Sequence, residues 1–402
     1  MKALTTCECT STSFREPLKI PRMTDRAVTL AKDLIACPSV TPEDAGAQVL
    51  LAKFLEQAGF TSTHLTFGEG VQKTPNLFAR IGNRGPHLCY GGHTDVVPPG
   101  PESKWTYGPF TPHIEDGILY GRGASDMKGS VAAFAAAAVS YIEKHGVPEG
   151  SISLLITGDE EGEADYGTVK VLEWLKQNNQ IPDVALVGEP TNPDYLGQEV
   201  KIGRRGSLSG RLRVMGRQGH VAYPQRADNP MPRLIAMLSA LQGIKWDEGT
   251  EFFPPTNFEI TTVDVGNKAS NVIPGEGNAT FNIRFNDLWT HGSLQDKIRE
   301  TLGQCGGAYE IIFTEGAHSF ITQPGAWSET MVKAVEEVTG HKPAYTTNGG
   351  TSDARFFANY CPVVEFGGVN ETVHRVDENA KVEDLQNLAK VFERLLEIYF
   401  SK

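Results

Sequence analysis

From Asp25 to about Pro190, the chain alternates between stretches with helical periodicity and short apolar runs bounded by Gly, Asp or Pro. The helical stretches are 25–36, 43–58, 127–144 and 166–178, and the strand-like runs are 87–90, 151–157 and 183–187. Alternation of this kind favours a sheet of mainly parallel strands that is covered by helices. We therefore predict an α/β fold with a mainly parallel mixed sheet flanked by helices.

A different pattern begins near Gly203. Segments 207–215, 257–265 and 278–285 alternate apolar and polar residues, which is typical of half-exposed antiparallel strands, and a helix is expected at about 230–243. After about residue 318 the first pattern returns, with a helix at 326–339, a strand at 362–366 and a helix at 382–399. We predict a discontinuous larger domain (24–205 and 319–402) and an inserted α+β domain (206–318).

The composition limits the possible functions. A chain of 402 residues is long enough for two hydrophobic cores. Its net charge of −12, without a basic cluster, argues against binding to nucleic acid. No apolar run reaches about 18 residues, so we expect no membrane span. Six scattered cysteines suggest neither a disulfide framework nor a zinc knuckle and favour the reducing cytoplasm.

Residues 1–22 differ from the rest of the chain. They are rich in Thr and Ser and lack the apolar segment of a secretory signal. We predict a disordered tail or an upstream start codon, and a transit peptide is the alternative.

Residue types that can bind metals, His, Asp and Glu, follow the predicted strands of the larger domain, each time after glycine. They are His93 and Asp95 after 87–90, Glu160 and Glu161 after 151–157, Glu189 after 183–187, and His374 beyond the glycines that follow 362–366. Because the carboxyl ends of parallel strands share one edge, these side chains should converge there. Asp126 joins them from a glycine-containing loop, 121–129, at the start of an alanine-rich helix.

Two imidazoles and three carboxylates suit two divalent ions with one carboxylate as a bridge. Such a pair lowers the pKa of a shared water and polarises the carbonyl that this water attacks. If the strand continued, Glu160 and Glu161 would point to opposite sides, so that one could bind metal and the other serve as general base. Asp95 is placed to accept the second ring N–H of His93.

Each of these signals has a plainer interpretation when it is taken alone. A single His-x-Asp is usually a surface turn, and a Glu-Glu pair is usually a solvated face. The acidic run 159–165 would also fit an open loop or a loose calcium site. The repetition of the pattern at four predicted strand ends favours the metal site.

Segments 92–98, 121–129, 158–162 and 188–190 resemble the zinc aminoacylase and carboxypeptidase family, and the likeness runs from about residue 24 to 402. Within it, segments 203–207, 349–355 and 364–370 are similar to the desuccinylase branch, whereas acetylornithine deacetylases differ around 349–355. The resemblance implies hydrolysis of N-succinyl-LL-2,6-diaminopimelate to succinate and LL-2,6-diaminopimelate, in lysine and diaminopimelate biosynthesis. The alternatives are a related N-acyl amino acid deacylase, a dipeptidase, or a catalytically silent relative that only binds an amino acid.

The resemblance also implies residue roles. One metal would be held by His93, Asp126 and Glu189, and the second by Asp126, Glu161 and His374, with Asp126 as the bridge. Zinc is the expected metal, and cobalt is possible. Glu160 would be the general base, and the peptide bond between Asp126 and Met127 would be cis.

The inserted domain, 206–318, is similar to the family's lid and dimerisation domain, which implies a homodimer. His220 matches the histidine that reaches the partner's active site and stabilises the oxyanion; without the family context it would be a solvated strand-end residue. The positions that match substrate contacts are Arg204, Tyr223, Asn271, Arg284, Gly350, Thr351 and Asn370. In isolation, Arg204 and Arg284 would be structural strand residues.

Overall fold

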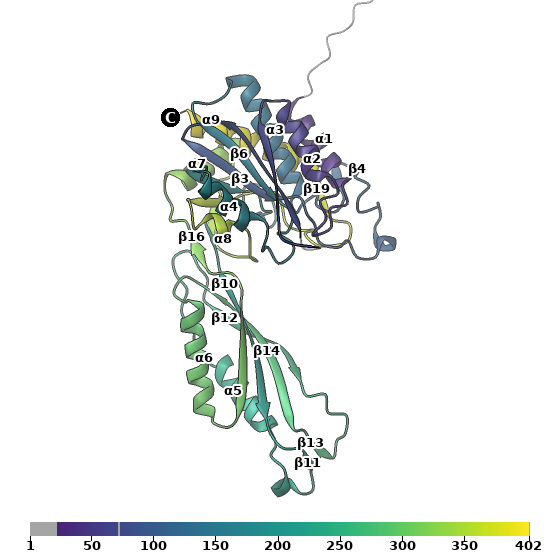
Figure 1. Cartoon of the computed structure of the whole chain (residues 1–402), viewed down its shortest axis with the longest axis vertical. Helices are drawn as coiled ribbons and strands as arrows, with labels where there is room; N and C mark the ends of the chain where they lie inside the picture. The colour runs from purple at the N-terminus through teal and green to yellow at the C-terminus, as the bar shows by residue number, and fades with distance from the viewer. Residues whose placement is uncertain (1–21, 71–72, 402) are drawn as a thin grey trace, which may run out of the picture.

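The computed structural model describes residues 22–70 and 73–401. The sequence prediction for the N-terminal tail, and Cys7 and Cys9, lie outside these residues. Figure 1 shows two bodies joined end to end, a larger one that contains the N- and C-terminal parts of the chain and a smaller one formed by its middle part. Among the described helices, none has the length and apolar character that crossing a bilayer requires.

The larger body is built on a mixed sheet, as the sequence predicted. In the described part of the chain this sheet has eight strands in the order β1-β2-β6-β3-β7-β18-β8-β17. Its central pairs β6–β3, β3–β7 and β7–β18 are parallel, whereas β1 and β2 form an antiparallel hairpin at one edge. The strands are β1 (Thr61–Phe67), β2 (Thr74–Gly82), β3 (His87–His93), β6 (Ser151–Thr157), β7 (Val184–Val187), β8 (Glu199–Lys201), β17 (Ala344–Thr346) and β18 (Val363–Glu365).

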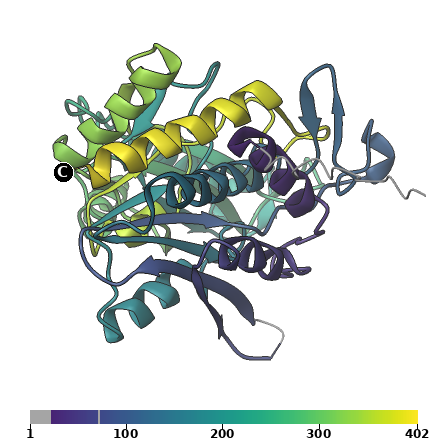
Figure 2. The same cartoon turned by 90° about the horizontal axis from the view of Figure 1, so that it is seen from above.

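Helices cover both faces of this sheet. The helices are α1 (Met23–Ile35), α2 (Ala47–Glu56), α3 (Lys128–His145), α4 (Thr168–Gln177), α7 (Ala326–Thr339), α8 (Ala354–Phe357) and α9 (Val382–Phe400). Helices α1, α3 and α9 pack together on one face (Figure 2), and α4 and α8 lie on the other. Strand β3 shows the two faces directly, because Leu88 and Tyr90 belong to the first core and Cys89 to the second.

Two local features explain how the helices fit. Every residue of α3 from Lys128 to Tyr141 is buried, because its small alanine side chains let it lie between the sheet and the helices α1 and α9. Helix α2 begins at Ala47 and not at residue 43, since Ala45 and Gly46 have φ angles of 48° and 87°, which are incompatible with a right-handed helix.

The smaller body is an antiparallel sheet with helices on one side. Within residues 206–315, all of which are described, its four strands follow the order β12-β14-β10-β15. Along β10, buried residues alternate with more exposed ones, as expected for a sheet with one face on a core. The elements are β10 (Gly206–Met215), β11 (Gly219–His220), α5 (Met231–Gln242), β12 (Asn257–Asp264), β13 (Val272–Ile273), β14 (Glu276–Phe285), α6 (His291–Cys305) and β15 (Tyr309–Glu315).

Short pairings connect the remaining segments. The chain leaves the larger body at β9 (Gly203–Arg204) and returns at β16 (Phe320–Ile321), and these two strands pair with each other. A three-stranded sheet of β4 (His113–Glu115), β5 (Ile118–Tyr120) and β19 (Asn379–Lys381) attaches the C-terminal segment to the loop before Asp126. Single turns of 3-10 helix occur at Glu102–Lys104 and Pro224–Arg226.

Candidate metal centre

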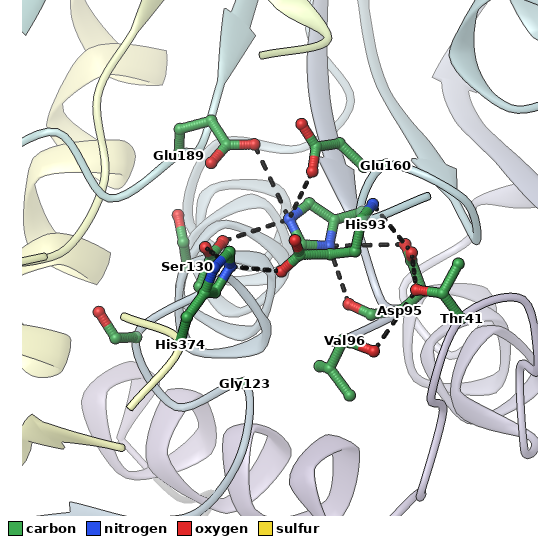
Figure 3. A network of polar contacts seen from close by, with 12 residues as sticks. Thr41, His93, Asp95, Val96, Gly123, Ser130, Glu160, Glu189 and His374 are labelled. Atoms are coloured by element: carbon green, nitrogen blue, oxygen red, sulfur yellow. Dashed lines mark hydrogen bonds and ion pairs between the residues drawn. The ribbon is translucent and has the colours of Figure 1, made fainter. Parts of the chain in front are cut away.

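Six side chains of the larger body meet at the carboxyl edge of its central strands, and Figure 3 labels four of them, His93, Glu160, Glu189 and His374. His93 ends β3, Glu160 and Glu161 lie in the loop after β6, and Glu189 comes two residues after β7. His374 lies between β18 and β19, and Asp126 directly precedes Met127 at the start of α3. Strands β6, β3, β7 and β18 are sheet neighbours, so their ends bring these residues together although up to 281 positions separate them in sequence.

Glycines permit the close approach of the loops that carry these residues. A Cβ at Gly188 would lie 1.9 Å from the Tyr90 hydroxyl, and one at Gly367 would lie 2.3 Å from the Gly188 carbonyl oxygen. Real side chains cannot occupy such positions. This packing explains why glycine precedes the acid after β7 and follows β18.

The first group of possible ligands is centred on His93. Its Nε2 lies 3.3 Å from Asp126 Oδ1, 3.8 Å from Glu189 Oε1 and 3.9 Å from Glu160 Oε2. One ligand atom from each of His93, Asp126 and Glu189 lies within 4.8 Å of the others. A single cation between these atoms would therefore be in reach of all three.

A second group shares one member with the first. His374 Nε2 lies 3.0 Å from Glu161 Oε1 and 3.4 Å from Asp126 Oδ2. The two carboxylate oxygens of Asp126 thus face different histidines, Oδ1 toward His93 and Oδ2 toward His374. This is the arrangement that a carboxylate bridging two cations requires.

Buried atoms without hydrogen-bond partners support a cation at the first group. Within the described residues, His93 Nε2, Asp126 Oδ1 and Glu189 Oε1 are buried and have no hydrogen-bond partner. A buried polar atom left unpaired costs free energy, so such atoms are rare unless an ion or water satisfies them. The three atoms belong to the three residues of one group, and imidazole nitrogen with carboxylate oxygen is a donor set that suits a divalent metal ion.

The electrostatics of the cluster point the same way. Burial, together with the nearby Asp126 carboxylate, raises the pKa of Glu189 to about 8. Burial and the Glu189 carboxylate raise the pKa of Glu160 well above its usual value. Contacts with Asp126 and Glu161 raise the pKa of His374 to about 10. Carboxylates this crowded favour the charged form only when a positive charge lies among them.

Asp95 lies next to the cluster but acts differently from the sequence expectation. The nearest acceptor to His93 Nδ1 is the backbone carbonyl oxygen of Asp95, at 2.9 Å, whereas its carboxylate Oδ1 lies at 3.5 Å. Because a carbonyl only accepts, Nδ1 carries the hydrogen and Nε2 presents a lone pair to the cluster. The Asp95 carboxylate accepts instead from the Thr41 hydroxyl (2.6 Å) and from the Glu161 backbone N–H (3.1 Å), and so holds the neighbouring ligand loop.

A cleft of about 530 Å³ opens beside the ligands. Its lining includes five of the residues that the sequence suggested as substrate contacts, which are Arg204, Arg284, Gly350, Thr351 and Asn370. Arg204 is buried, pairs with the Glu365 carboxylate, and donates to the Gly350 carbonyl at 3.1 Å. The Asp126–Met127 peptide bond is cis, which confirms that expectation.

Lys201 also lines this cleft, and the sequence reasoning missed it. The residue is 3 % exposed and contacts Asn348 and the Glu199 carboxylate. The sequence feature that could have indicated Lys201 as a cleft residue is its position in a short strand segment, two residues before Gly203.

Three other expected site residues lie elsewhere in the chain. His220 belongs to β11, at the end of the smaller body that is far from the sheet (Figure 1), and Tyr223 and Asn271 lie beside it. All three are exposed, and His220 Nδ1 accepts a hydrogen bond from the Ala222 backbone N–H at 3.1 Å. One chain by itself does not bring them to the ligand cluster.

Comparison with known proteins places this geometry in a family. Residues 89–398 match the model of peptidase family M20/M25/M40. The succinyl-diaminopimelate desuccinylase of Gluconacetobacter diazotrophicus is 54 % identical over 92 % of this chain and 96 % of its own length, and that of Rhodospirillum centenum is 53 % identical over 93 % and 97 %.

Solved structures share the fold at low sequence identity. An M20 metallo-carboxypeptidase of Sulfolobus solfataricus has a TM-score of 0.75 at 20 % identity, covering 94 % of this chain and all of its own. A dinuclear metal-binding M20 peptidase of Bacillus subtilis has a TM-score of 0.69 at 15 % identity, covering 94 % and 99 %. Since the family model spans more than half of the chain and the curated relatives span nearly all of it, the protein belongs to peptidase family M20/M25/M40.

Proposed function

We propose that the protein hydrolyses the succinyl amide of N-succinyl-LL-2,6-diaminopimelate, releasing succinate and LL-2,6-diaminopimelate in diaminopimelate and lysine biosynthesis. Curated relatives that are 50 % identical or more over at least 92 % of this chain carry that activity in their names. The observation that carries the proposal is the shared Asp126, whose two oxygens face separate ligand groups beside Glu160, in a cleft that is also lined by Arg204 and Arg284.

Two divalent cations would occupy the cluster, one held by His93, Asp126 and Glu189 and the other by Asp126, Glu161 and His374. When bound, such a pair polarises the amide carbonyl and lowers the pKa of a water molecule. We propose zinc, which takes this mixture of imidazole and carboxylate ligands, with cobalt as a functional substitute.

Glu160 is the proposed general base. Its Oε2 lies 3.9 Å from His93 Nε2, so its carboxylate is at the cluster, and its pKa is raised by burial. Glu160 would take a proton from the water as the water oxygen bonds to the amide carbon. When the C–N bond breaks, Glu160 would return this proton to the departing nitrogen.

The arginine side chains that line the cleft suit a substrate with three carboxylates and one ammonium. A protein with a net charge of −12 cannot attract such a substrate through its overall charge, so local groups must hold it. Arg204 already uses part of its guanidinium on Glu365 and Gly350. Within the described residues Arg284 has no side-chain hydrogen bond or ion pair, and it lines the same cleft. Its planar fork is therefore available to a carboxylate of the substrate.

We further propose that residues 206–318 form a lid and dimerisation domain and that the active protein is a homodimer. Strand β12 is an edge of the smaller sheet, and its residues from Thr261 to Asp264 are exposed. On this edge Val263 is 53 % exposed, and elsewhere on the body Ile235 on α5 and Ile312 on β15 are 65 % and 66 % exposed. An unpaired edge with exposed apolar residues is typical of a surface that a partner covers. His220, Tyr223 and Asn271 would then reach the cleft of the partner.

The cytoplasm is the proposed location. The cysteines Cys37, Cys89, Cys305 and Cys361 of the described residues are all thiols. Free thiols are typical of a reducing compartment. The binding partners that we propose are a second copy of the chain and the small-molecule substrate. We propose no binding to nucleic acid or to a membrane.

The substitution Glu160→Gln tests the mechanism. The amide keeps the shape of the side chain but cannot accept the proton, so kcat should fall by about 10²- to 10⁴-fold while two zinc ions remain bound. Glu163→Gln, in the same acidic loop but exposed to solvent, is the matched control and should retain activity. Substantial turnover by the Glu160 variant would show that another group is the base.

Substrate choice is tested separately. Turnover of N-succinyl-LL-2,6-diaminopimelate, N-acetylornithine and a dipeptide should be measured side by side, with and without a chelator. We expect the succinyl substrate to be preferred and the chelator to abolish its turnover. A preference for either of the other substrates would assign a different amide hydrolysis to this site.

A further inference from the structure

Glu378 is a buried carboxylate outside both ligand groups, and it holds the loop that carries Asp126. The residue is 0 % exposed and lies four positions after His374. Its Oε1 accepts hydrogen bonds from the backbone N–H groups of Ser125 and Asp126, both at 3.0 Å. Its Oε2 accepts from the Gly123 N–H at 3.1 Å and from Arg122 Nη1 at 2.7 Å.

The loop 121–126 depends on these bonds because it belongs to no regular element. Of its six backbone N–H groups, three donate to the Glu378 carboxylate and that of Gly121 donates to the Glu378 carbonyl oxygen at 2.9 Å. The other two donate to Pro109 O and Gly121 O. Buried backbone donors need acceptors, and the Glu378 carboxylate supplies the acceptor for three of the six.

Glu378 lies in the same hydrogen-bonded turn as His374. The segment from Thr372 to Asn379 is closed on itself by two bonds, one from the Asn379 N–H to the Thr372 hydroxyl at 3.0 Å and one from that hydroxyl to the Asn379 carbonyl at 2.9 Å. His374 and Glu378 therefore belong to one compact turn. Glu378 thus links this turn to the Asp126 loop, and Asp126 Oδ2 lies 3.4 Å from His374 Nε2.

We propose that Glu378 is a positioning residue of the metal centre, which sets the spacing of Asp126 and His374 and thereby the affinity of the second cation site. The inference rests on the proposed two-metal function. Two of the three ligands of the second site, Asp126 and His374, depend on Glu378, whereas the first site shares only Asp126. Outer residues that orient metal ligands change affinity by about 10- to 100-fold when they are altered.

The test measures zinc binding directly rather than turnover. Metal-free wild-type protein and the variants Glu378→Gln and Glu378→Asp are titrated with Zn²⁺ in competition with a chromophoric chelator. The glutamine keeps the size but loses the charge, and the aspartate keeps the charge but cannot reach both sets of donors. For both we expect the second ion to bind about 10- to 100-fold more weakly and the first to change less.

The matched control is Glu393→Gln. Glu393 is also a largely buried glutamate that pairs with a cation, Lys144 at 2.7 Å, but it lies on α9 in the hydrophobic core region and contacts no ligand loop. Its variant should bind both ions as the wild type does, even if its melting temperature falls. The control separates a general loss of stability from a specific loss of the second site.

The possible outcomes decide between the proposals. If the wild-type protein binds fewer than two ions, the proposed metal centre fails and not only the role of Glu378. If the wild type binds two and the Glu378 variants bind both with unchanged affinity, or with equal losses at the two sites, the positioning role is refuted. Failure of both variants to fold in the absence of zinc would also refute it, because Glu378 would then support the whole fold.

Discussion

The assignment of His220 to the partner's centre predicts that two defective variants restore each other's activity when they are mixed. Glu160→Gln removes the base from a chain's own cluster. His220→Ala removes a side chain at the far end of the smaller body, on β11 (Figure 1). If each active site takes Glu160 from one chain and His220 from the other, a mixed dimer contains one site with both groups and one site with neither.

The expected recovery follows from this geometry. Random pairing of equal amounts gives about half mixed dimers, and one of the two sites in each is intact, so about a quarter of all sites should be active. Loss of a single group that stabilises an oxyanion costs about 3 kcal/mol, which leaves the His220→Ala parent at about one hundredth of wild-type activity. The mixture should therefore exceed that parent by about 25-fold.

The assay follows the loss of amide absorbance with N-succinyl-LL-2,6-diaminopimelate after the chains have exchanged. Two affinity tags, one on each variant, verify that mixed dimers form. Glu160→Gln mixed with Asp126→Ala is the control, because both changes damage the cluster of the same chain and no intact site can arise. Activity equal to the mean of the two parents, with mixed dimers present, would exclude a role for His220 in the partner's site.

Two further predictions concern stability. Burial lowers the pKa of His87 to about 4, below its value of 6.5 in an unfolded chain. As the pH falls, the unfolded state therefore binds a proton before the folded state does. The free energy of unfolding should decrease as the pH falls from 6.5 toward 4. Urea unfolding at pH 7 and pH 5 should show a loss that is about 2 kcal/mol smaller in His87→Gln than in the wild type, and equal losses would contradict the assignment. Zinc at about 100 times its dissociation constant should stabilise metal-free protein by about 2.7 kcal/mol per site, or roughly 3 °C in melting temperature for a chain this long. Calorimetry of Asp126→Ala should show little of that increase, and an equal increase would place the zinc elsewhere.

The approximate position of the site could be predicted from sequence because it depends on a general property of parallel sheets. His93, Glu160, Glu161 and Glu189 each follow a short apolar run, and the structure makes these runs neighbours in one sheet. The sequence does not give the order of the strands in the sheet. This order is not needed to predict the site, because any order in which these strands are neighbours brings the residues to the same edge.

Strand β1 and helix α6 are harder to predict from the sequence. Strand β1 is mostly exposed and polar, so the hairpin that it forms with β2 does not show the apolar run of a buried strand. Helix α6 begins with a capping box formed by Thr290 and Ser293, where the serine replaces the usual glutamate. Its mean hydropathy is low, so its periodicity was not detected among the strands around it.

The residues that orient the ligands were the hardest to predict, and the structure shows why. Two of the ligand loops, the one after β6 and the one before α3, are held by acids that are not among the proposed ligands. Asp159 accepts the Tyr166 N–H at 2.9 Å, Asp95 accepts the Glu161 N–H, and Glu378 accepts three N–H groups of the loop before α3. Their partners are backbone groups, which leave no pattern in the side chains, and those of Glu378 lie more than 250 positions away.

This division of labour has a physical basis. Carboxylates that face one another across the cluster repel, and this repulsion works against the geometry of the cluster before a cation arrives. Glu378 and Asp95 are held differently: burial raises their pKa, and the hydrogen bonds that they accept from backbone N–H groups lower it without any metal. They can therefore keep the loops in place and present Asp126, Glu161 and His374 at the spacing that a cation needs. The acids around the cluster thus include Glu378, which accepts backbone hydrogen bonds, and Asp126 and Glu189, whose buried oxygens face His93 without a hydrogen-bond partner and are suited to bind the metal.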